Sequence, residues 1–157
     1  MAGILRISEA ASLALHAMVI LAENPATHIS TRDIADRLKA SEFHLSKIMQ
    51  RLARAGFVAS VRGPKGGFLL RTPADEISLL NVYEAIEGPF KTAECLLSDP
   101  ICGHQKCVIG SLVASVNRQV FDCFNRTKIG DLPAGACRKS GTAQNDTSDD
   151  VSPPDRE

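Results

Sequence analysis

The sequence lacks the features of a membrane or secreted protein. None of its apolar runs approaches the roughly 20 residues that a membrane-spanning helix needs. Its first ten residues, MAGILRISEA, lack the basic stretch, the apolar stretch and the cleavage site of a secretory signal. We therefore expect a cytoplasmic protein without a membrane partner. Its 157 residues, 44% of them hydrophobic, favour one compact domain with appendages over two independent domains.

Motifs of common enzyme classes are also missing. The chain has no Cys-x-x-Cys redox pair and no glycine-rich phosphate loop after a strand. Its four histidines are scattered, and no Ser/His/Asp set can be assembled from them. The sequence therefore predicts a protein that is not an enzyme.

The chain has no net charge, because 18 basic residues balance 18 acidic ones. Their distribution is nevertheless uneven: no Asp or Glu occurs between Phe43 and Ala74, whereas the segment after Cys137 carries five. The acid-free stretch holds six basic residues, Lys47, Arg51, Arg54, Arg62, Lys65 and Arg71. A phosphate backbone responds to local charge rather than to net charge, so we expect one positive surface.

Apolar periodicity predicts a helix-turn-helix. We expect a first helix over residues 7–22 with Ser8 as its N-cap, and a second helix that opens at Ser30. A third helix, capped by Ser41 and ending at Ala55, has apolar residues spaced i, i+3, i+4, i+7. These are Leu45, Ile48, Met49 and Leu52.

A hairpin and two further helices follow. Residues 57–61 and 68–71 are β-prone and flank a glycine-rich tip, which is typical of a β-hairpin wing. We expect a fourth helix from Ser78 to Gly88 and a long last helix over residues 108–124. The apolar stripe of the last helix is wider than a small winged domain needs, which indicates a partner helix. It consists of Ile109, Leu112, Val113, Val116, Val120 and Phe124.

The predicted fold is therefore mainly α with a small β-hairpin: a winged helix-turn-helix plus a long C-terminal dimerisation helix. We divide the chain into four segments. They are a DNA-binding domain (1–90), a cysteine-rich sensor loop (91–107), the dimerisation helix with its extension (108–132) and a disordered tail (133–157).

Burial of one side of the third helix leaves its other side for DNA. The N-terminal residues on that side are placed to meet base edges in a major groove, and the cations to meet phosphates. The candidates on this helix are Ser41, Glu42, His44, Lys47, Gln50, Arg51 and Arg54. In the hairpin tip, Arg62 and Lys65 suit a phosphate or minor-groove contact. The alternative is a solvated helix face and a surface hairpin, but capped helices, an acid-free stretch and a basic wing together favour DNA binding.

Three of the five cysteines, Cys95, Cys102 and Cys107, lie in a segment broken by glycine and proline. In a reducing compartment, clustered thiols are more often metal ligands or redox groups than disulfides. Three thiolates on a loop can turn toward one centre, which suits an iron–sulfur cluster or zinc; three unligated thiols are the alternative. We expect Cys123, in the last helix, to be a small buried hydrophobe.

Taken together, these motifs resemble the bacterial Rrf2-type transcriptional regulators, which include iron–sulfur-cluster regulators such as IscR and NsrR. The resemblance covers roughly residues 5–132. Its most specific parts are the RGPKGG hairpin tip at 62–67, VYEAIEG at 82–88 and the three-cysteine loop. It implies a homodimer on a palindrome-like double-stranded DNA operator, with the last helices crossing and each cysteine loop near the partner's DNA-binding half.

The resemblance also implies a fourth cluster ligand from the first helix of the partner subunit. His16 matches a relative that uses histidine there, and we rank it ahead of Glu9, His104 and Ser12. Mixed ligation favours a two-iron cluster, with a four-iron cluster as the alternative. The cysteine gaps of six and four residues are less equal than is usual in the family. The main prediction is a regulator whose operator affinity is controlled by the cluster, and the alternative is a regulator without a cluster that uses a thiol switch or zinc. The signal, the operator and the direction of regulation stay open.

Overall fold

The computed structural model describes residues 7–63, 66–91 and 108–132. These residues form α1 (Glu9–Ala22), α2 (Thr31–Leu38), α3 (Glu42–Arg54), β1 (Val58–Val61), β2 (Gly67–Leu70), η1 (Ala74–Glu76), α4 (Leu79–Glu87), α5 (Val108–Arg126) and η2 (Ile129–Asp131), where η marks a 3-10 helix. The fold is thus mostly helical with one hairpin, as predicted. None of the helices in these three ranges is both long and apolar enough to span a bilayer. Lys65, the three clustered cysteines and the predicted disordered tail lie outside the described residues.

Serine side chains set the starts of the first four helices. Each of them accepts a hydrogen bond from the backbone N–H three residues further on, which satisfies one donor that the first helical turn leaves unpaired. The capping residues are Ser8, Ser30, Ser41 and Ser78. All four predicted caps are confirmed. Helix α1 begins at Glu9 rather than Ile7, because its cap residue is itself extended, with φ −62° and ψ 156°.

The turn between α2 and α3 is tight and uses a left-handed residue that is not glycine. Lys39 closes α2 with φ 52° and ψ 41°, and its N–H bonds back to Ala35 and Asp36. Two residues later Ser41 caps α3, so the helix-turn-helix predicted from sequence is present. At the other end of α3, Gly56 follows the helix with φ +86°, a conformation in which glycine has no steric cost.

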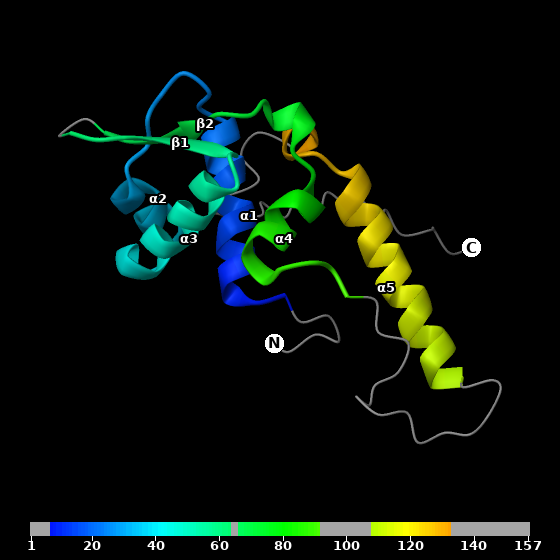
Figure 1. Cartoon of the computed structure of the whole chain (residues 1–157). Coiled ribbons are helices and arrows are strands. Elements are labelled where there is room, and N and C mark those ends of the chain that lie inside the picture. Colours follow the sequence, from blue (N-terminus) through cyan, green and yellow to red (C-terminus); the bar gives the residue numbers. More distant parts are fainter. Residues whose placement is uncertain (1–6, 64–65, 92–107, 133–157) are drawn as a thin grey trace, which may run out of the picture.

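Helix α1 lies at the centre of the domain and packs against α3 and α4 (Figure 1). Five of its residues are completely buried: Ala11, Ala14, Ala17, Met18 and Leu21. The apolar side predicted for α3 is confirmed, since all four of its residues are buried in the same core: Leu45, Ile48, Met49 and Leu52. Burial of this side fixes which side of α3 faces outward.

The hairpin is anchored to the helical core by the segment before α2. Its strands pair antiparallel with Val58 opposite Leu70, one residue away from the predicted ends. Phe68 and Ile29 exchange two backbone hydrogen bonds of 2.9 and 3.0 Å. Gly67 is needed at this contact, because a Cβ there would lie 2.5 Å from the carbonyl oxygen of Ile29. The start of β2, next to the hairpin tip, is therefore held beside the segment that leads into α2.

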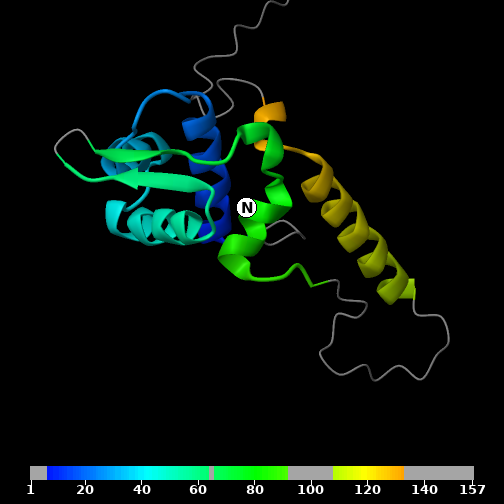
Figure 2. The ribbon, with the colours of Figure 1, turned by 45° about the horizontal axis from the view of Figure 1, so that its top comes forward.

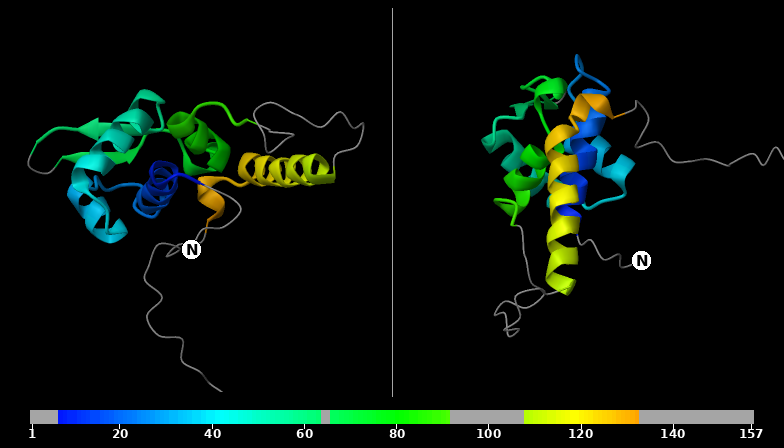
Figure 3. Two further views of the ribbon diagram at one scale, coloured as in Figure 1. Left: turned by 90° about the horizontal axis from the view of Figure 1, so that it is seen from below. Right: turned by 90° about the vertical axis from the view of Figure 1, so that its right-hand side faces the viewer.

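Helix α5 is attached to the domain mainly through its C-terminal half. The rings of Phe121 and Phe124 pack edge-on against Phe90 and Tyr83, with centroids 5.6 and 5.9 Å apart. Buried Ile129, just after the helix, donates a backbone hydrogen bond to Ile77. The N-terminal half of α5 extends beyond the rest of the domain (Figures 1 and 3).

Cys123 is exposed, so its predicted burial is wrong. It lies seven residues after Val116 and therefore on the same side of α5 as the exposed Ile109, Leu112 and Val116. The aromatic residues that contact α4 are on a different side of the helix. Periodicity identified an apolar helix correctly, but it did not distinguish the side that packs within the chain from the side left uncovered.

Candidate nucleic-acid interface

The outward side of α3 carries the polar residues predicted to meet DNA. Six of these residues are exposed: Ser41, Glu42, Lys47, Gln50, Arg51 and Arg54. Arg62, at the start of the hairpin tip, is exposed as well. His44 differs from the others, because it is half-buried and its Nε2 atom is enclosed without a hydrogen-bond partner among the described residues. We call α3 the recognition helix, since it is the second helix of the helix-turn-helix.

The recognition helix and the hairpin share one end of the molecule. In Figures 1 and 3, α2, α3 and the hairpin lie at the end opposite α5. Figure 2 shows the hairpin extending beyond the helical body, beside α2 and α3. The recognition helix and the hairpin, which carry the predicted DNA contacts, thus lie at the end of the domain away from the long helix. This arrangement suits a helix in a major groove with a wing along the adjacent backbone.

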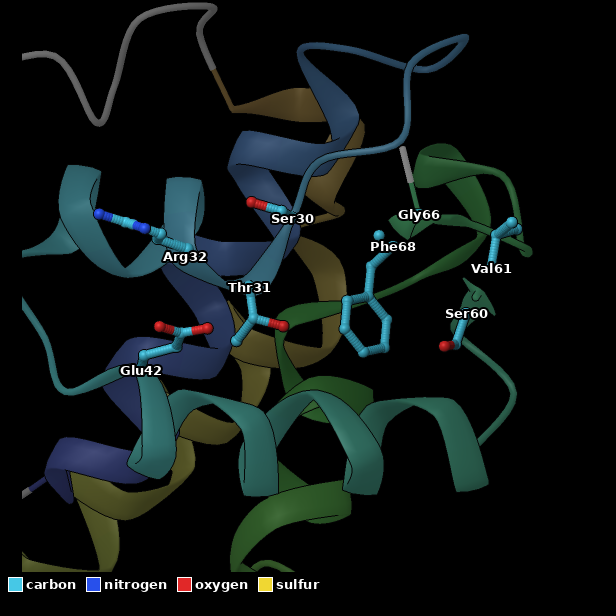
Figure 4. A pocket seen from close by; sticks show the side chains of 9 residues that line it. Ser30, Thr31, Arg32, Glu42, Ser60, Val61, Gly66 and Phe68 are labelled. Atoms are coloured by element: carbon cyan, nitrogen blue, oxygen red, sulfur yellow. The ribbon is translucent and has the colours of Figure 1, made fainter. Parts of the chain in front are cut away.

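A shallow hollow of about 290 Å³ lies between the starts of α2 and α3 and the hairpin. Figure 4 shows its lining, which comes from three elements: Thr31 and Arg32 from α2, Glu42 from α3, and Ser60 and Phe68 from the hairpin. Sequence analysis did not identify the start of α2 as part of this surface. The signal was available, since Ser30 predicts the start of a helix whose first residues, Thr31 and Arg32, are polar.

Phe43 is another residue that sequence analysis missed. It is the second residue of the recognition helix, and 72% of its surface is exposed. The ammonium of Lys47 lies 4.2 Å from the centre of its ring. The buried residues of this helix follow a helical spacing that begins at Leu45, and Phe43 does not fit that spacing. This mismatch is the sequence signal that would have marked Phe43 as outward-facing.

Arg51 has a structural contact that its predicted phosphate role did not include. Its guanidinium donates a hydrogen bond to the backbone carbonyl of Ile86, near the end of α4. An arginine side chain has five N–H donors, so one bond to a carbonyl leaves the group able to contact a phosphate as well. Arg51 therefore belongs both to the α3–α4 contact and to the predicted interface.

Three candidate cluster ligands of α1 lie on one side of the helix, with Glu9 and His16 exposed and Ser12 half-buried. The Nδ1 atom of His16 lies 2.7 Å from the carbonyl oxygen of Ser12. A carbonyl oxygen only accepts hydrogen bonds, so Nδ1 carries the proton and Nε2 of the neutral ring carries the lone pair. This is the tautomer that a metal-binding histidine adopts when its other nitrogen is bonded to a carbonyl.

The described residues do not themselves form a metal site, because nowhere among them do three or more His, Cys, Asp or Glu side chains come together. Cys95, Cys102, Cys107 and His104 lie outside the described residues. The structure therefore gives positions for the α1 candidates and none for the thiolates. The cluster ligand set stays a prediction.

Comparison with known proteins places this architecture in a family. The family model Rrf2, described as an iron-dependent transcriptional regulator, matches residues 7–135. The transcriptional regulator IscR of Erwinia tasmaniensis is 31% identical over 100 residues, which cover 64% of this chain and 61% of that protein.

Two solved structures of CymR are also similar. CymR of Bacillus subtilis, titled the global cysteine regulator, shares 25% identity with a TM-score of 0.69, over 82% of this chain and 95% of that one. The oxidised form of Staphylococcus aureus CymR shares 29% identity with a TM-score of 0.66, over 81% and 94% of the two chains. The chain belongs to the Rrf2 family, and it is a winged-helix transcriptional regulator rather than an enzyme.

Proposed function

We propose that two copies of the chain bind a palindrome-like operator, each inserting the N-terminal half of its recognition helix into a major groove. The observation that carries this proposal is the outward side of α3, where exposed cations follow a capped and polar N-terminus. The wing residues Arg62 and Lys65 would contact the adjacent backbone. Because these contacts neutralise phosphates, affinity should fall steeply with salt.

The homodimer in this proposal forms through α5. Its N-terminal half bears three exposed large apolar residues, Ile109, Leu112 and Val116, spaced i, i+3, i+7 on one side of the helix. An exposed apolar stripe of this spacing is what a second helix covers in a coiled-coil-like pair. The same helix of a second copy carries the identical stripe, so a two-fold arrangement would bury both at once.

The regulatory part of the proposal is an iron–sulfur cluster held by Cys95, Cys102 and Cys107 with His16 of the partner subunit. His16 supports this, because its ring is exposed on α1 and its Nδ1 atom lies within hydrogen-bond distance of the carbonyl oxygen of Ser12, a contact that metal-binding histidines commonly make with their other nitrogen. The name of the family model, iron-dependent transcriptional regulator, and the similarity to IscR support it as well. Ligation across the dimer would favour one spacing of the two recognition helices, and operator affinity would then follow cluster state.

The deciding experiment is an absorption spectrum with iron and sulfide analysis on protein purified without oxygen. We expect visible charge-transfer bands and equal amounts of iron and acid-labile sulfide. Cys102→Ala should abolish both, and His16→Ala should shift the bands or lower the iron content. Cys123→Ala is the matched control, because it also removes one thiol but from α5, and it should retain the cluster. Full iron and sulfide in Cys102→Ala would refute the ligand assignment.

The similarity to CymR supports a second candidate, a cluster-free thiol switch, since one of the similar structures is of an oxidised form. A colourless protein without iron that still binds DNA would favour this candidate. Zinc analysis of the same sample separates a zinc-held loop from a set of thiols. DNA binding that changes on oxidation and recovers with a reductant would then establish the thiol switch.

A further inference from the structure

Phe43 is the one aromatic residue among the exposed large apolar residues of the described ranges. Ile109, Leu112 and Val116 form a stripe on α5, whereas Phe43 is on the recognition helix, at the opposite end of the molecule. Val61, which is also exposed, ends strand β1 of the hairpin at that same end. Phe43 is also the most exposed large apolar side chain of the described residues, at 72%. The side chain therefore contributes little to the core and is available for a contact outside the chain.

The position of Phe43 selects the kind of contact. In helix-turn-helix proteins the N-terminal residues of the second helix reach base edges in the major groove. The apolar group that base edges present in the major groove is the 5-methyl group of thymine, and phenylalanine side chains contact this group. The other exposed residues of the first turn, Ser41 and Glu42, are polar and can supply hydrogen bonds but no apolar surface.

Lys47 gives the ring of Phe43 a defined placement. Its ammonium lies 4.2 Å from the ring centre, one helical turn along, so one face of the ring is covered by a cation. The pairing keeps the positive charge beside the aromatic ring on the surface predicted to meet DNA. A ring held in this way loses less conformational freedom on binding than an unrestrained one.

We propose that Phe43 is a specificity-determining residue that reads thymine through its 5-methyl group in each operator half-site. This inference rests on the proposed DNA-binding function. It predicts that the operator contains a thymine at one defined position per half-site, where the methyl group rather than the hydrogen-bonding pattern is selected. Loss of one buried methyl group should weaken binding about three- to fivefold.

The test uses the full chain, purified without oxygen, and a duplex selected from a randomised DNA library. Each thymine of that duplex is replaced in turn by deoxyuridine, which deletes only the 5-methyl group. We expect one position per half-site at which the native chain binds the uracil duplex three- to fivefold more weakly. Phe43→Ala should bind both duplexes equally at that position, with an unchanged salt dependence. Phe43→Leu should keep part of the preference.

Arg54→Ala is the control, since it should weaken binding to both duplexes by the same factor and leave the uracil effect in place. An equal uracil effect in the native chain and in Phe43→Ala would assign the methyl contact to another residue and overturn the inference. The absence of any uracil-sensitive position would overturn it too, while leaving the proposed function standing. A native chain that selects no sequence from the library would refute both.

Discussion

The guanidinium of Arg51, in the recognition helix, donates a hydrogen bond to the backbone carbonyl of Ile86 in the last turn of α4. The neighbouring Glu87 accepts a 2.5 Å hydrogen bond from Ser8, the cap of α1. The end of α4 is thus tied to both α3 and α1, immediately before the segment that leads to the cysteines.

Replacing Arg51 by alanine should therefore affect stability as well as DNA binding. The variant loses a charge-assisted hydrogen bond to a carbonyl at the end of α4, which should lower the free energy of unfolding by about 1 kcal/mol. Arg54→Ala removes the same charge from an exposed position of the same helix and should leave stability within about 0.5 kcal/mol. Urea denaturation followed by circular dichroism distinguishes the two. Equal stabilities would mean that the Arg51–Ile86 bond contributes nothing measurable.

Lys65→Ala should weaken DNA binding and lower the slope of log affinity against log salt by about one. The physical reason is the loss of one neutralised phosphate. Arg126→Ala removes one charge at the end of α5, away from the hairpin, and should leave the slope unchanged. Fluorescence anisotropy titrations at several salt concentrations measure both. A slope that Lys65→Ala does not change would remove this residue from the interface.

Leu112→Glu should convert the proposed homodimer to a monomer, because it places a charge in the middle of the exposed stripe of α5. Ser111→Glu adds the same charge at the adjacent exposed position, which faces a different side of the helix, and should remain dimeric. Light scattering coupled to size-exclusion chromatography gives the mass directly. A dimeric Leu112→Glu protein would place the dimer contact elsewhere.

Lys39→Gly should stabilise the protein by about 0.5 kcal/mol. Lys39 is held at φ 52°, where a Cβ is strained, and glycine relieves this strain at a smaller entropic cost. Arg37→Gly, two residues earlier inside α2, has no strain to relieve and should destabilise by about 1 kcal/mol. Thermal or urea unfolding of the pair tests the sign. Destabilisation of both variants by the same amount would mean that the left-handed turn carries no strain.

Local signals in the sequence determined the helices, the hairpin and the core side of α3. A serine cap, the stop at Gly56 and the apolar spacing from Leu45 to Leu52 act within a few residues, so they can be identified without knowledge of the rest of the chain. The polar residues of the predicted interface followed from the same spacing. Their roles in binding, and those of the three cysteines, stay predictions.

Contacts between distant residues decided what the sequence did not determine. Arg51 reaches Ile86, 35 positions away, only because α3 and α4 pack side by side. Cys123 was predicted to be buried and is exposed, because the rings of Phe121 and Phe124 turn another side of α5 toward Phe90 and toward Tyr83 of α4. The sequence by itself determined which residues are apolar and which serines cap the first four helices. Only the tertiary structure decided which apolar sides are covered, since burial depends on the element that packs against them.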